Sequence, residues 1–186
     1  MRLFLLTVLF SLSLLAVHAQ TNLPPLDKSP MDVSYYPVNY PLLKVQGKST
    51  EPLVARVIYS RPQKNGRVIF GELIGYGSVW RLGANEATEI EFYKDVKINN
   101  VKIKKGRYTL YCIPYPDKWT LILNKETDIW GSFGYDTKKD LLRVTLPVQK
   151  QPAVTEEFVM AFEKASGGAA LVIAWDDLKL SLPISF

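Results

Sequence analysis

The chain has one histidine and one cysteine among its 186 residues, which limits the chemistry open to it. His18 lies in an N-terminal apolar segment that we expect to be removed, so the mature chain would contain no histidine. Serine or cysteine catalysis that depends on histidine, and histidine-ligated metals, are therefore not expected. Cys112 has no second cysteine for an intrachain disulfide, and its alternation with Tyr108 and Leu110 predicts a buried, inert thiol. We predict no metal site and no cofactor.

Blocks of one charge are also missing, because the net charge of +5 comes from scattered lysines and arginines. This composition does not predict nucleic-acid binding. The one long apolar run, Leu3 to Val17, follows Met1-Arg2 and precedes Ala19, as in a secretory signal peptide. Its length of about 15 residues is short of the roughly 20 needed to span a bilayer. We expect cleavage after Ala19, export to the periplasm or beyond, and no transmembrane segment in the mature chain.

The rest of the chain divides into a leader and one domain. Residues 20–52 contain QTNLPPLDKSP and YYPVNYP, which predict a proline-rich extended leader and a first strand region. Tyr35 to Pro41 in particular should be extended, because the residue before a proline resists helix. Residues 53–186 are expected to form a single domain with a sizeable core.

Short runs with period-two alternation predict strands throughout that domain. Asn99-Asn100 lies between two matched Val-Lys-Ile runs and predicts a two-residue hairpin turn. No window predicts a long amphipathic helix. Nine or ten short strands without alternating helices predict an all-β fold, an antiparallel β-sandwich resembling a jelly roll. The expected strand runs are 53–60, 67–70, 90–92, 96–103, 107–113, 119–124, 142–148, 158–162, 171–175 and 178–184.

One stretch is more specific than a scaffold needs. Tyr-Ser-Arg-Pro begins at Tyr59, and Val-Trp-Arg-Leu-Gly-Ala-Asn-Glu-Ala-Thr spans Val79 to Thr88. With Gly66-Arg67 and Phe70-Gly71, this pattern resembles an exported bacterial family known as a domain of unknown function, number twenty-nine eleven. The resemblance covers nearly the whole mature chain. It implies secretion and a single β-rich domain, and it brings no catalytic residues with it.

The same stretch supplies the candidate ligand site. Arginine binds carboxylate or phosphate through its planar fork, tryptophan stacks on rings, and asparagine and glutamate fix orientation by hydrogen bonds. The alternative is an internal network in which Glu86 and Asp140 neutralise the arginines and hold long loops together. The candidate ligand-binding residues are Arg61, Arg67, Trp80, Arg81, Asn85, Glu86, Trp130 and Asp140.

Three functions remain open from the sequence. The first is non-catalytic binding of a small anionic or sugar-like ligand, or of a cell-envelope protein, with no catalytic residue. The second is a glycan hydrolase that uses carboxylates, because Glu89 and Glu91 on one strand would lie about 7 Å apart, as in inverting glycosidases. The third is a structural envelope protein that pairs through its edge strands.

Overall fold

Ten β-strands, one short α-helix and a 3₁₀ turn (Thr137–Lys139) make up residues 23–186, the part of the chain that the computed structural model describes. The predicted signal peptide, residues 1–19, lies outside the described residues. The strands and the helix are β1 (Met31–Tyr36), α2 (Tyr40–Val45), β2 (Ala55–Ser60), β3 (Glu89–Phe92), β4 (Val96–Ile98), β5 (Val101–Ile103), β6 (Gly106–Pro114), β7 (Lys118–Asn124), β8 (Asp140–Pro147), β9 (Gln149–Ala165) and β10 (Gly168–Ser185).

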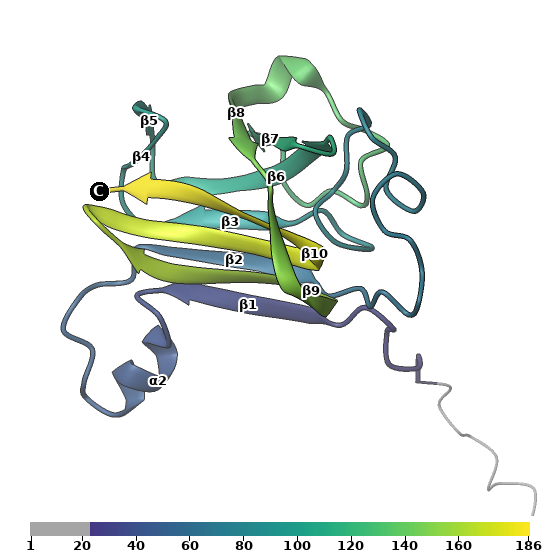
Figure 1. The fold of residues 1–186 in the computed structure, drawn as a ribbon. Coiled ribbons are helices and arrows are strands. Elements are labelled where there is room, and N and C mark those ends of the chain that lie inside the picture. Colours follow the sequence, from purple (N-terminus) through teal and green to yellow (C-terminus); the bar gives the residue numbers. More distant parts are fainter. Residues whose placement is uncertain (1–22) are drawn as a thin grey trace, which may run out of the picture.

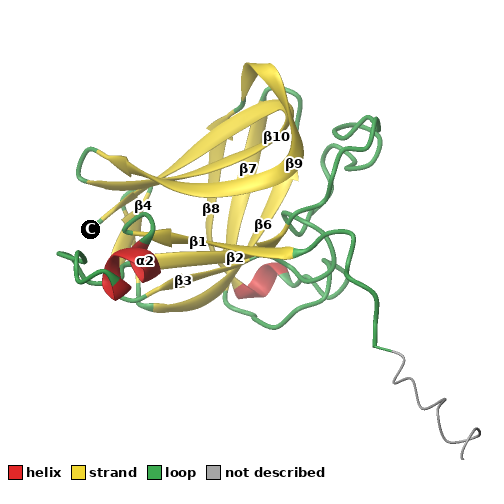
Figure 2. Ribbon diagram, turned by 90° about the horizontal axis from the view of Figure 1, so that it is seen from below, coloured by secondary structure: helices red, strands yellow, loops and turns green. Residues whose placement is uncertain are grey.

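The strands form two antiparallel sheets, which confirms the predicted β-sandwich class. The larger sheet has the order β1-β2-β3-β6-β7-β8, and the smaller has the order β5-β4-β10-β9. Val148 alone separates β8 from β9, so the chain passes from one sheet to the other at that residue. Figures 1 and 2 show β9 and β10 lying across β1, β2 and β3. A hydrogen bond of 3.0 Å from the Phe162 backbone N–H to Ser34 Oγ joins the two layers.

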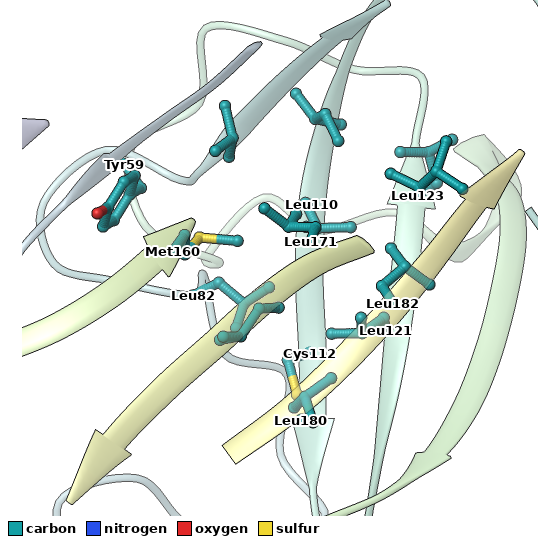
Figure 3. Packing of buried hydrophobic residues seen from close by; sticks show 14 of the residues in the cluster. Tyr59, Leu82, Leu110, Cys112, Leu121, Leu123, Met160, Leu171, Leu180 and Leu182 are labelled. Atoms are coloured by element: carbon teal, nitrogen blue, oxygen red, sulfur yellow. The ribbon is translucent and has the colours of Figure 1, made fainter. Parts of the chain in front are cut away.

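Apolar side chains that alternate along the strands fill the space between the sheets. Figure 3 shows Leu110 and Cys112 of β6 facing Leu171 and Leu180 of β10. All four are almost fully buried. Burial of this apolar surface is the main force that holds the two sheets together. The period-two pattern was therefore a sound guide to the fold, because it records which face of each strand is buried.

The predicted hairpin turn at Asn99-Asn100 is confirmed. Ile98 pairs with Val101 across the turn, and the two asparagines take φ angles of 48° and 63°. Both central residues of this turn type need a positive φ, which asparagine adopts more easily than most residues.

Two local expectations are wrong. The extended conformation expected up to Pro41 ends earlier, because helix α2 begins at Tyr40. Asn39 takes a left-handed φ of 59° and Pro41 falls in the first helical turn, where a proline leaves no intrahelical bond unmade. The strand expected at 67–70 is a loop, since Gly66 and Gly71 adopt φ angles of 69° and 97° at its ends.

Strand β10 reverses direction within its own length. A Cβ atom on Gly168 would lie 2.1 Å from the carbonyl oxygen of Ile184, whereas an extended chain from residue 168 to residue 184 would span about 50 Å. Asp176 has a φ of 56°, and the pairing with β9 shifts register on both sides of it. The two arms that meet there correspond to the separate strands predicted at 171–175 and 178–184.

The single cysteine offers a test of the core. Cys112 is 0% exposed, and burial raises the pKa of its thiol. We expect a thiol reagent such as DTNB to leave the native protein unmodified and to modify one thiol per chain in urea, because a buried thiol reacts only after opening. A rapid reaction in native buffer, absent from Cys112→Ala, would contradict this packing.

Candidate functional site

Two long connections meet at one end of the sandwich. The β2–β3 connection, residues 61–88, is on the right in Figure 1, and the β7–β8 connection, residues 125–139, lies above it. We call residues 81–88 the Arg81 loop and residues 125–139 the Trp130 loop. Six of the eight predicted site residues belong to these two loops or border them, and the other two, Arg61 and Arg67, lie earlier in the β2–β3 connection.

The Arg81 loop is anchored to strand β6. Trp80 and Cys112 exchange two backbone hydrogen bonds of 2.7 and 2.9 Å. The Thr88 N–H donates to the Arg81 carbonyl over 3.1 Å and closes the loop, and the Leu110 N–H donates to Thr88. The loop therefore leaves and rejoins the sheet at neighbouring points, so its position is set by the sheet.

The Trp130 loop is held by two backbone hydrogen bonds to the Arg81 loop and by a third hydrogen bond to the residues just before that loop. The Gly131 N–H donates to the Asn85 carbonyl over 2.9 Å, and the Ala87 N–H donates to Ile129 over 2.8 Å. Ser132 Oγ donates to the Val79 carbonyl over 3.1 Å. These contacts bring Asn85, Glu86 and Trp130 together. The Trp130 side chain is 59% exposed, and Glu86 is also exposed.

Arginines that look alike in the sequence differ in their surroundings. Arg61 forms an ion pair of 3.0 Å with Asp32. Arg67 donates to the backbone carbonyls of Gln63 and Lys64 within its own turn. Arg81 makes no ion pair and no side-chain hydrogen bond within residues 23–186, although its Nε atom is buried. Burial lowers the pKa of Arg81, and no neighbouring carboxylate offsets this effect.

Trp80 is a core residue, which corrects the expectation that it stacks on a ligand. Only 4% of it is exposed, and its ring stacks on Trp175 at a centroid distance of 5.9 Å. Trp119 and Phe158 meet it edge to face. Its indole N–H donates to the Gly83 carbonyl over 3.1 Å, so Trp80 fixes the Arg81 loop from beneath.

Asp140 also has a structural role, which corrects its placement in the ligand site. Asn124 Nδ2 and the Tyr135 hydroxyl donate to its two carboxylate oxygens over 2.9 and 2.7 Å. Arg143 forms an ion pair of 2.8 Å with it. These bonds pin the end of the Trp130 loop to β7 and β8. Tyr135 was not among the predicted site residues, although its partner Asp140 lies only five residues along the chain.

Glu89 and Glu91, the acid pair of the hydrolase hypothesis, are each bound to an arginine. Glu91 lies 2.8 Å from Arg56, and Glu89 lies 3.4 Å from Arg107. These are cross-strand ion pairs on the outer face of the larger sheet, an ordinary arrangement for opposite charges on neighbouring strands. Within residues 23–186 no group of three histidine, cysteine or acidic side chains could hold a metal ion.

Three hollows within the described residues lie away from these loops. One of about 320 Å³ opens between the β4–β5 hairpin, β8 and the β9–β10 turn, where Lys97 is the one charged lining residue. The size of a hollow does not by itself make it an anion site. A positively charged side chain without a counter-charge, such as Arg81, is the stronger indication. The Arg81 loop is therefore the better candidate site, as an open surface rather than a deep pocket. No helix within residues 23–186 is long and apolar enough to cross a membrane.

Comparisons with known proteins give one match. A model of the family described as "Protein of unknown function (DUF2911)" matches residues 43–184. No curated protein and no solved structure matches the chain.

Proposed function

The chain belongs to the DUF2911 family, whose function is unknown, and from its loops we propose that it is an exported protein that binds a small anionic or carbohydrate-like ligand without catalysing a reaction. The observation that carries the proposal is Arg81. It is the one arginine among residues 23–186 whose side chain has neither a carboxylate nor a carbonyl partner.

An arginine in this position is costly for the free protein. Moving a charged group out of water without a partner destabilises the folded state, and burial of Arg81 Nε removes one of its donors from water. A carboxylate or phosphate of a ligand would supply the missing partner in two-pronged geometry. Residues that reduce stability in this way are characteristic of functional sites.

The neighbouring side chains suit a ligand with a ring. Trp130 is mostly exposed, and its backbone pairs with that of Glu86, which follows Asn85 in the chain. An indole ring offers a broad apolar platform on which a sugar or aromatic ring can lie. Glu86 and Asn85 can then receive or donate hydrogen bonds at the edge of that ring.

The N-terminal segment supports export. Its short basic start, apolar run and small residue at Ala19 have the order of a secretory signal peptide. The ligand would then be met in the periplasm or outside the cell. A single cysteine is compatible with that setting, since no disulfide is needed.

The proposal predicts opposite effects on stability and binding at Arg81. Arg81→Met should raise the free energy of unfolding of the ligand-free protein by about 0.5–2 kcal/mol, because a partly desolvated cation without a partner is removed. The same variant should lose the rise in melting temperature that acidic sugars, dicarboxylates or phosphates give the wild type. Urea unfolding and thermal shifts measure the two effects.

Arg61→Met is the matched control. It breaks the half-exposed ion pair with Asp32, so it should lower stability by up to about 1 kcal/mol and leave any ligand shift in place. If Arg81→Met instead destabilises the protein and no compound shifts the wild type, Arg81 is a structural residue and the proposal fails.

A further inference from the structure

The backbone of the Arg81 loop has an unusual imbalance of donors and acceptors. Its carbonyl groups at Arg81, Leu82, Gly83 and Asn85 all accept hydrogen bonds from protein groups. In contrast, none of the backbone N–H groups from Arg81 to Glu86 donates to an acceptor within residues 23–186. The loop thus directs its acceptors into the protein and leaves a run of donors unpaired.

Burial makes these free donors significant. Leu82 is 0% exposed, and Gly83 is buried as well. More than nine-tenths of buried backbone N–H groups in proteins have a hydrogen-bond partner, so the unpaired N–H groups of Leu82 and Gly83 are unusual. Leu82, Gly83 and Asn85 have φ angles of 53°, 147° and 57°. Successive backbone N–H groups in turns can form concave sites that bind anions.

The position of this loop is fixed before any ligand arrives. A Cβ atom on Gly83 would lie 3.0 Å from the Ser60 carbonyl oxygen and 3.5 Å from the Ser60 nitrogen. Glycine therefore lets the loop pack directly on the end of β2. Together with the bond from Trp80 Nε1, this contact holds the donors in place, so binding would need little rearrangement.

The charge of the site bears on the choice of anion. Arg81 contributes one positive charge, and the exposed Glu86 contributes one negative charge at the far end of the same loop. A phosphate monoester carries about −1.5 to −2 at neutral pH, so both its attraction to Arg81 and its repulsion by Glu86 exceed those of a single carboxylate. A planar carboxylate matches the guanidinium fork in two-pronged fashion.

We propose that the Arg81 loop binds the carboxylate of a ring-bearing acid, such as a uronic acid or an aromatic carboxylic acid. Backbone N–H groups of residues 84–86, which are not fully buried, and the Arg81 guanidinium bind the carboxylate, and Trp130 supports the ring. This inference rests on the proposed function and narrows it to one class of ligand. The two sources of the carboxylate, a sugar acid or an aryl acid, share this recognition and are separated by experiment.

The test uses amide-resolved NMR titration of the full mature chain with glucuronate, benzoate, glucose, glucose 6-phosphate and acetate. We expect glucuronate or benzoate to shift the amide signals of residues 84–86 and to bind at least tenfold more tightly than glucose or glucose 6-phosphate. The tighter of the two acids identifies the source of the carboxylate. Arg81→Gln should abolish these shifts.

Trp130→Ala separates the ring from the carboxylate. Because Trp130 is mostly exposed, this variant should fold normally and bind the preferred ring acid about tenfold more weakly, with acetate affinity unchanged. Tighter binding of glucose 6-phosphate that depends on Arg81 would overturn the carboxylate assignment and keep the proposed function. Ring acids that bind without moving the 84–86 amides would overturn the loop as the site, and no binding by any compound would overturn both.

Discussion

Replacing Trp80 with alanine is expected to lower the free energy of unfolding by about 3–5 kcal/mol, the usual cost of deleting a large buried aromatic side chain. Trp80 is 4% exposed and contacts Trp175, Trp119 and Phe158 in the core. Its loss would leave a cavity among rigid rings that cannot collapse easily. It would also free the Gly83 carbonyl, which accepts a bond from the indole N–H.

Trp130→Ala is the matched control for this prediction. Trp130 lies in the adjoining loop and is 59% exposed, so its removal should change stability by no more than about 0.5 kcal/mol. Urea unfolding followed by far-ultraviolet circular dichroism compares the two variants with wild type. Equal losses of stability would show that the two tryptophans do not differ in burial, and the division between a core tryptophan and a surface tryptophan would be wrong.

The sequence predicted the buried faces of the strands but not two local backbone conformations. The period-two runs predicted the sandwich because a strand with one buried face alternates apolar and polar residues along the sequence. The helix at 40–45 was not predicted because it begins after the left-handed residue Asn39. A left-handed backbone conformation produces no periodic pattern of apolar residues in the sequence. The loop at 67–70 was missed for a similar reason, because its β-branched residues are flanked by glycines that turn the chain.

The site was predictable only as a region. Arg61 and Arg81 have similar sequence surroundings, but Asp32 is the partner of Arg61 and comes from β1. Which arginine remains without a counter-charge depends on contacts between distant segments. Asp140, by contrast, was assigned to the ligand site although its partner Arg143 lies only three residues away on β8. Counter-charges, rather than residue types, separate Arg81 from the other arginines.

The second large effect is expected at Gly168, where alanine should destabilise the protein by about 3 kcal/mol, at the upper end of the usual cost of overpacking. The added Cβ would lie 2.1 Å from the Ile184 carbonyl oxygen and 2.9 Å from the Ser185 Cα atom. Both obstacles are backbone atoms, so no side-chain rotation can relieve the clash. The two ends of β10 would have to move apart where Gly168 lies against Ile184.

Gly134→Ala provides the control, because a Cβ at that position meets nothing within 4 Å and its backbone is not left-handed. Its stability in urea should stay within about 0.5 kcal/mol of wild type. Separation of the β10 arms should also weaken the 3.2 Å bond from the Tyr36 hydroxyl to the Gly168 carbonyl, which ties β1 to the smaller sheet. Gly168→Ala with wild-type stability would mean that the ends of β10 do not meet in solution. The reversal of β10 at Asp176 would then be incorrect.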